Sequence, residues 1–178
     1  METIDPARIT LRQFALSDAD DFFSWASDNR VTRNLMWTPL TSREQLLAIM
    51  REVPVGIPQQ WRRSICVDGR SVGIVLVYPE SGDDRCHAEI SYTVAADYWG
   101  RGIATRGVKL ALSQVFHDLM EVLRLQALVD VNNRASQRVL EKAGFRQEGL
   151  LRKYSYLKGE LQDLYLYSFL STDSISLD

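Results

Sequence analysis

The chain of 178 residues lacks most features that mark secreted, membrane-bound or nucleic-acid-binding proteins. Its two cysteines, Cys66 and Cys86, form neither a metal-binding spacing nor a disulfide framework, which favours the cytoplasm or the nucleus. No apolar run approaches the ~20 residues that span a bilayer, and the acidic first residues lack the apolar core of a signal peptide. A formal net charge of −2, without a basic run, gives no electrostatic basis for binding nucleic acid.

The composition and length of the chain are typical of one soluble globular domain. The length is enough for one well-filled core and short for two. No internal repeat or low-complexity tract interrupts it. We expect a single domain over residues 1–172, followed by a mobile tail over 173–178, with Cys66 and Cys86 as small buried side chains.

Glycines number only ten, but two of them lie in the most informative segment, Tyr98-Trp99-Gly100-Arg101-Gly102-Ile103-Ala104-Thr105. This segment separates a strand-like stretch from a long amphipathic one. A glycine turn that opens a helix presents unpaired backbone N–H groups at the positive end of the helix dipole. Such donors suit a phosphate or pyrophosphate, so we expect a phosphorylated cofactor.

Two common phosphate-binding motifs do not fit this segment. The Walker loop ends in Gly-Lys-Ser or Gly-Lys-Thr, which the chain does not contain. The dinucleotide fingerprint Gly-x-Gly-x-x-Gly follows the first strand of a parallel unit. Here Thr105 stands at its third glycine, and the segment lies past the middle of the chain.

Two further motifs follow in order: Asn133-x-x-Ser136, and Glu141-Lys142-Ala143-Gly144-Phe145. Together the three motifs resemble the GNAT superfamily of acetyl-CoA-dependent N-acetyltransferases, whose pyrophosphate loop reads Gln/Arg-x-x-Gly-x-Gly/Ala. Trp99 replaces the first residue of that loop, and this departure is similar to the branch that contains ribosomal-protein alanine N-acetyltransferases. The resemblance is strongest over residues 88–149.

Alternation and turn signals predict strands over residues 9–12, 61–67, 72–78, 86–95, 123–131, 145–156 and 162–170. Helices are predicted after a cap at Ser17, after a capping box Thr41-x-x-Glu44, over about 102–120, and from Asn133 to a left-handed cap at Gly144. Pro54 and Pro58 should end the second of these. A strand–helix–strand crossover makes the strands at 86–95 and 123–131 parallel neighbours.

The predicted fold class is therefore α/β (α+β). We expect a mixed, largely antiparallel sheet of about seven strands with helices on both faces. The resemblance implies that the parallel pair splays apart and holds coenzyme A, with the pyrophosphate at the start of the helix after Gly102.

The resemblance places the catalytic base of the family at Glu89. Strand alternation puts Glu89 and Thr93 on one face and Tyr92 and Val94 on the other. A bulge near Ala95 would re-aim the strand end. The alternative for Glu89 is a solvated sheet residue paired with an arginine.

The same resemblance implies the cofactor contacts. Backbone groups of Thr93 and Val94 would meet the thioester and the pantetheine amides, and Asn133 and Ser136 the pantetheine arm. Ser136 is also a candidate donor to the leaving thiolate, although both of these residues suit a plain helix cap. The pyrophosphate would bind the loop residues Arg101, Gly102, Ile103, Ala104 and Thr105.

The acceptor side gives weaker signals. Trp37 and Tyr154 would line it, and Asp163 matches an acidic residue that the family often has before its last strand, but all three also suit core or turn positions. The resemblance implies an N-acetyltransferase that uses acetyl-CoA and a primary amine, such as a protein N-terminus, without metal. The alternatives are an acetyltransferase for a small amine (a polyamine, an amino acid or a xenobiotic) and a non-catalytic CoA-binding sensor. Either a monomer or a homodimer is compatible with the sequence.

Overall fold

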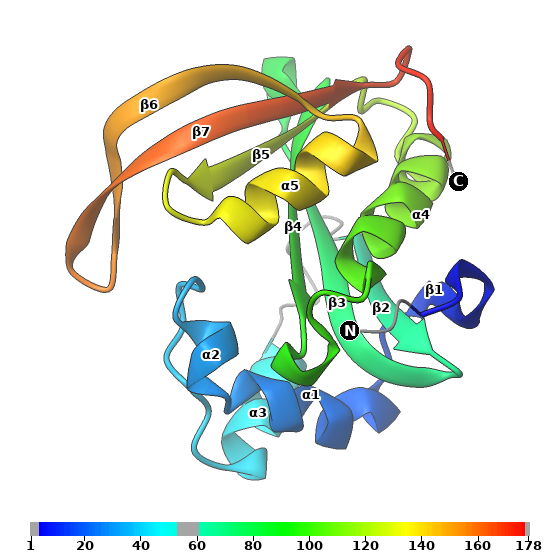
Figure 1. Ribbon diagram of the computed structural model, residues 1–178, viewed down its shortest axis with the longest axis vertical. Coiled ribbons are helices and arrows are strands. Elements are labelled where there is room, and N and C mark those ends of the chain that lie inside the picture. Colours follow the sequence, from blue (N-terminus) through cyan, green and yellow to red (C-terminus); the bar gives the residue numbers. More distant parts are fainter. Residues whose placement is uncertain (1–3, 53–60, 177–178) are drawn as a thin grey trace.

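The computed structural model describes residues 4–52 and 61–176 (Figure 1). Its centre is a seven-stranded sheet in the order β1-β2-β3-β4-β5-β7-β6, which confirms the predicted fold class. The strands are β1 Ile9–Gln13, β2 Trp61–Val67, β3 Arg70–Pro79, β4 His87–Val94, β5 Arg124–Asp130, β6 Arg146–Leu157 and β7 Glu160–Leu170. The α-helices are α1 Ala19–Ala26, α2 Asn29–Thr32, α3 Arg43–Glu52, α4 Ile103–Asp118 and α5 Arg134–Ala143, and short 3-10 turns are η1 Pro6–Arg8, η2 Leu16–Asp18, η3 Gly82–Asp84 and η4 Ala96–Tyr98.

Strand pairing agrees with the predicted mixed, largely antiparallel sheet. β4 and β5 are parallel neighbours, as the crossover predicts, whereas every other neighbouring pair of the described sheet is antiparallel. The turn between β2 and β3 has φ of 50° at Asp68 and 83° at Gly69. Two positive φ values in a two-residue turn are the type I′ geometry that an Asp-Gly pair favours.

Helices cover both faces of the sheet. Val75 and Val77 of β3 belong to a core cluster shared with α4 and α5, whereas Ile74 and Leu76 pack into a second cluster with α1 and α3. Alternation along one strand thus divides the core into two layers, with α4 and α5 on one side and α1 to α3 on the other (Figure 1).

Gly107 lets α4 pack closely against the sheet. A Cβ on this residue of α4 would lie 2.8 Å from Ile65 Cδ1 of β2. A side chain there would push α4 away from the sheet.

Two helix caps differ from the prediction. Ser42 begins α3, because its Oγ accepts from Gln45 N at 3.1 Å, while Gln45 Oε1 accepts from Thr41 N at 3.1 Å. Ser42 is therefore the N-cap, one residue after the predicted one, and the side chain of Gln45 reaches back to the residue before the cap. Pro54 and Pro58, expected to end this helix, lie outside the described residues.

The first helix begins without a Ser17 cap. Asp18 is 2% exposed, and its carboxylate accepts from Ala15 N, from Ser64 Oγ at 2.8 Å and from the Arg12 guanidinium. This carboxylate joins the start of α1 to the sheet, because a buried charge needs such partners. Of the two cysteines, Cys66 is buried as predicted, whereas Cys86 is exposed.

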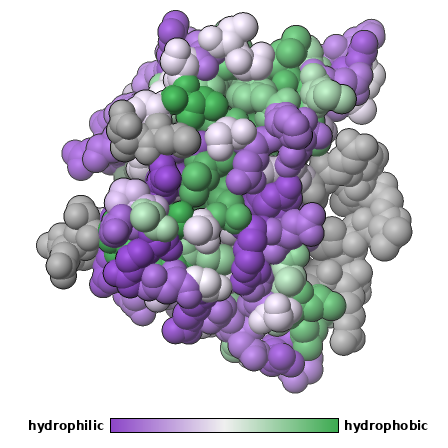
Figure 2. Space-filling model, turned by 90° about the vertical axis from the view of Figure 1, so that its right-hand side faces the viewer, coloured by the Kyte–Doolittle hydropathy of each residue, from purple (hydrophilic) through white to green (hydrophobic). Residues whose placement is uncertain are grey.

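The side of the molecule seen in Figure 2 is mostly hydrophilic, and its hydrophobic areas are separate from one another. Among the helices of the described ranges, none is long and apolar enough to cross a bilayer. The same ranges contain no group of three His, Cys, Asp or Glu side chains placed to hold a metal ion.

Candidate active site

The two parallel strands part in the middle of the sheet. β4 and β5 pair over only three positions, the last of which is Glu89 opposite Gln126, although β4 continues to Val94 and β5 to Asp130. The splayed pair that the resemblance implied is therefore present. α4 and α5 begin just beyond the carboxyl ends of these strands, so two positive helix ends lie at the open end of the pair.

The glycine turn presents free donors at the start of α4. Gly102 is the N-cap with φ of 82°, and a Cβ there would meet no other atom within 4 Å. Within residues 4–52 and 61–176, the backbone N–H groups of residues 101–105 donate to no other group. Unpaired amides at the start of a helix are the arrangement that binds a phosphate group, so the turn fits the pyrophosphate of a CoA thioester.

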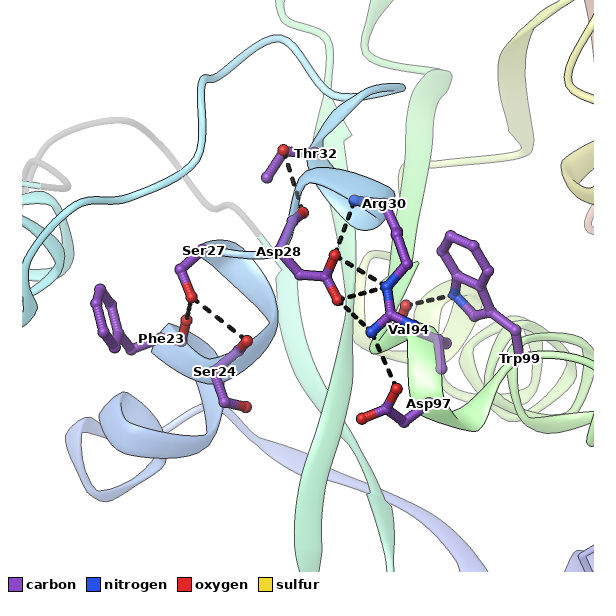
Figure 3. A network of polar contacts seen from close by, with 9 residues as sticks. All are labelled: Phe23, Ser24, Ser27, Asp28, Arg30, Thr32, Val94, Asp97 and Trp99. Carbon is purple, nitrogen blue, oxygen red and sulfur yellow. Dashed lines mark hydrogen bonds and ion pairs between the residues drawn. The ribbon is translucent and has the colours of Figure 1, made fainter.

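Two side chains fix the turn. Trp99 Nε1 donates to the carbonyl oxygen of Val94 at 2.7 Å, which ties the turn to the end of β4 (Figure 3). The Arg101 guanidinium lies 5.7 Å from the ring centroid of Tyr98 and forms no ion pair with any described residue. Its charge is therefore available to an anion at the turn.

Glu89 lies where the strands begin to part. It is half-buried and stands opposite Tyr78 of β3 and Gln126 of β5. Burial, followed by the nearby charge of Glu80, raises the pKa of its carboxyl group. No basic side chain in the described ranges pairs with it, so the alternative of a surface ion pair is not what the structure shows.

The backbone amides of Thr93 and Val94 point in opposite directions. Ala95 N donates to Val72 O at 2.8 Å, and the donors of an antiparallel strand face the same neighbour at every second residue. The amide of Thr93 therefore points to β3, and that of Val94 points to the edge from which β5 has departed. This corrects the prediction that both amides face the cofactor. The predicted bulge at Ala95 is also wrong, because β3 and β4 pair without a register shift and the chain turns through η4 instead.

At the start of α5, Asn133 Oδ1 accepts from Ser136 N at 3.2 Å and caps the helix. The Tyr92 hydroxyl lies 3.0 Å from the Ser136 carbonyl oxygen, to which it donates, and 2.6 Å from Ser136 Oγ. Tyr92 thus joins β4 to α5 across the parted strands, on the face opposite Glu89. Burial raises the pKa of Tyr92, so the phenol stays protonated at neutral pH.

Sequence reasoning gave Tyr92 the correct face but no partner. Residues 92 and 136 are 44 positions apart and lie on different elements. Alternation predicts which face a side chain occupies, not which helix it meets there.

Replacing Tyr92 with phenylalanine should lower the free energy of unfolding by about 1 kcal/mol, the typical net contribution of one buried hydrogen bond. Urea denaturation measures this change. Tyr154→Phe is the matched control, because Tyr154 is 55% exposed and its hydroxyl bonds to no described residue. Equal stabilities of the two variants would contradict the link between β4 and α5.

The sequence model of the acetyltransferase (GNAT) domain matches residues 8–146. The chain belongs to the GNAT family of acetyltransferases. It is 32% identical over 180 residues to an uncharacterised N-acetyltransferase, p20, of Bacillus licheniformis, covering 97% of this chain and 98% of that protein. It is also 32% identical over 106 residues to a putative ribosomal N-acetyltransferase, YdaF, of Bacillus subtilis, covering 60% of this chain and 57% of the relative.

The fold of this GNAT protein also matches solved structures. Spermidine N-acetyltransferase from Vibrio cholerae, in complex with CoA and spermine, superposes with a TM-score of 0.78 at 20% identity, covering 93% of this chain and 97% of the other. As a GNAT family member, the protein is an N-acetyltransferase that uses acetyl-CoA.

The predicted acceptor residues of this GNAT protein lie on separate elements. Trp37 packs against the cluster of α1 and α3, and its Nε1 is buried without a partner among the described residues. Tyr154 lies on β6, within the irregular stretch between Leu151 and Ser155. Asp163 Oδ1 accepts from Lys153 N at 2.7 Å within this irregular stretch, which is the turn role that the sequence left open.

Proposed function

We propose that this protein transfers the acetyl group of acetyl-CoA directly to a primary amine in the cytoplasm, with the N-terminal alanine or serine of a protein as its first acceptor. One observation carries the proposal: free amides at the start of α4 lie at the open end of two parting strands, with Glu89 at their last pair. Residues 101–105 would hold the pyrophosphate, and the backbone of Val94 and the side chains of Asn133 and Ser136 the pantetheine arm.

Glu89 would act as the general base. An alkylammonium with a pKa of about 10 must lose a proton before its nitrogen can attack the thioester carbon. The raised pKa of Glu89 brings its carboxylate closer to the pH at which proton acceptance is efficient. As the new C–N bond forms and the C–S bond breaks, Ser136 Oγ would donate toward the leaving sulfur. Since its own pKa is high, we expect hydrogen bonding there rather than a completed proton transfer.

A ribosomal acceptor is favoured by the partial similarity to YdaF and by the Trp99 variant of the loop. A polyamine is the second candidate, because a structure with the same fold is a spermidine N-acetyltransferase. Trp37 and Tyr154 would line the acceptor site in either case. The unpartnered Nε1 of Trp37 is a buried donor that an acceptor carbonyl or hydroxyl would satisfy.

Thiol release from acetyl-CoA, followed across a panel of peptides and small amines, tests this function. We expect turnover with peptides that begin with alanine or serine, and a product mass that places the acetyl group on the N-terminal nitrogen. Turnover with spermidine alone would support the polyamine candidate. Binding of acetyl-CoA without turnover on any acceptor would contradict catalysis and indicate a sensor.

A further inference from the structure

The hairpin of β6 and β7 reaches across to α2. Its tip and α2 lie on the same side of the molecule (Figure 1), and Lys158 Nζ donates to the carbonyl oxygen of Thr32 at 2.7 Å. That oxygen also accepts from Leu35 N at 2.9 Å, and Thr32 is only 1% exposed. A lysine at an exposed turn therefore reaches a buried acceptor 126 positions away.

The turn itself does not explain this lysine. φ is 52° at Lys158 and 87° at Gly159, nearly the values of Asp68 and Gly69 in the other hairpin. The first position of such a turn favours asparagine, aspartate or glycine, because other residues with positive φ are strained. The chain has the favoured residue at Asp68 and a disfavoured one at Lys158, so turn preference does not account for this lysine, whereas its contact with Thr32 ties the hairpin tip to α2.

The other end of α2 is fastened to the cofactor side. Arg30 pairs with Asp28 on its own segment and with Asp97 of η4 at 3.0 Å (Figure 3). η4 leads directly into Trp99 and the glycine turn. α2 therefore stands between two contacts, with the hairpin tip on one side and the start of the pyrophosphate loop on the other.

These contacts lie on the face from which an acceptor would reach Glu89. Leu76, which packs against the cluster of α1 and α3, shares its face of the sheet with Ser91, its partner in β4. Ser91 and Glu89 are two residues apart and so share that face. α2 belongs to the same cluster through Val31.

We propose that Lys158 is a specificity-determining residue, which narrows the acceptor entrance by fastening the hairpin tip to α2. This inference rests on the proposed function. With the contact in place, a slender amine reaches Glu89 between α2 and the hairpin more easily than a bulky one. Without the contact, α2 and the hairpin tip separate more readily, and kcat/KM for bulky acceptors rises relative to that for slender ones.

Lys158→Asn tests the role without endangering the fold, because asparagine suits the turn better than lysine. Lys153→Asn is the matched control. Lys153 lies on the same hairpin with φ of 51°, and its side chain bonds to no residue in the described ranges. Two measurements are made on each purified variant. The first is hydrogen exchange of the amides of residues 29–35. The second is kcat/KM for three acceptors: a long and a short peptide that share an N-terminal alanine, and spermidine.

We expect Lys158→Asn, and not Lys153→Asn, to speed exchange over residues 29–35 by about threefold or more. The ratio of kcat/KM for the long peptide to that for the most slender active acceptor should rise about three- to tenfold, which corresponds to ~0.7–1.4 kcal/mol. Unchanged exchange would overturn the fastening, and faster exchange with an unchanged ratio would overturn the role in specificity. If the wild-type protein acetylates no acceptor, the proposed function fails and the specificity role with it, whereas the exchange still decides whether Lys158 holds α2.

Discussion

Gly102→Glu should weaken acetyl-CoA binding by about 100-fold or more, or ~2.8 kcal/mol. The N-cap position of α4 faces open space, so the fold has room for the new side chain. The carboxylate would stand among the free amides of residues 101–105, where the phosphates of the cofactor would otherwise bind. Isothermal titration with CoA measures the loss.

The control for this variant separates binding from backbone strain. A residue with a side chain at φ of 82° costs about 1–2 kcal/mol in stability whatever its charge. Gly69→Glu carries the same strain at φ of 83°, also with open space around it, in the turn between β2 and β3. It should lose similar stability and keep its affinity for CoA. Unchanged affinity in Gly102→Glu would remove the assignment of the glycine turn.

Glu89→Gln should lower kcat by about 10²–10⁴-fold, the usual contribution of a general base. The amide keeps the shape of the carboxyl group but cannot accept the proton of the acceptor. Affinity for CoA should change little, because the pyrophosphate site lies at the turn. Steady-state kinetics with the best acceptor of the panel measures the effect, and a wild-type rate would point to another base.

The pH dependence gives a second, independent check on Glu89. Its pKa is raised in the folded state, so wild-type activity should rise with pH through that raised value as the base ionises. Glu80→Gln removes a nearby negative charge and should move this rising limb of the pH–rate profile to lower pH while preserving the maximal rate. A limb that stays in place would show that another group titrates.

The raised pKa of Glu89 also makes the stability of the fold depend on pH. Between the unfolded pKa of about 4.3 and the raised folded value, the folded state binds more protons than the unfolded one. The contribution of Glu89 to stability is therefore present below the unfolded pKa and is lost as pH rises through the folded one. Glu89→Gln should melt at a higher temperature than wild type at pH 7, and this gain should disappear near pH 4.

The sheet and most of its connections were predictable because their signals are local. Asp68-Gly69 selects one turn geometry, and alternation along β5 places Leu125 and Ala127 in the core. The errors arose where neighbouring residues offer equivalent chemistry. Thr41 and Ser42 can both cap a helix, and only the position of Gln45 in the folded chain decides between them.

The order of three short motifs determined the family, the cofactor and the glycine turn, because backbone geometry at a helix start depends on a few adjacent residues. Tertiary structure alone decided three other features. It gave Val94 rather than Thr93 an amide at the open edge, joined Tyr92 to Ser136, and placed Lys158 on Thr32. Each of these depends on which element lies opposite a residue, and packing of the whole chain sets that.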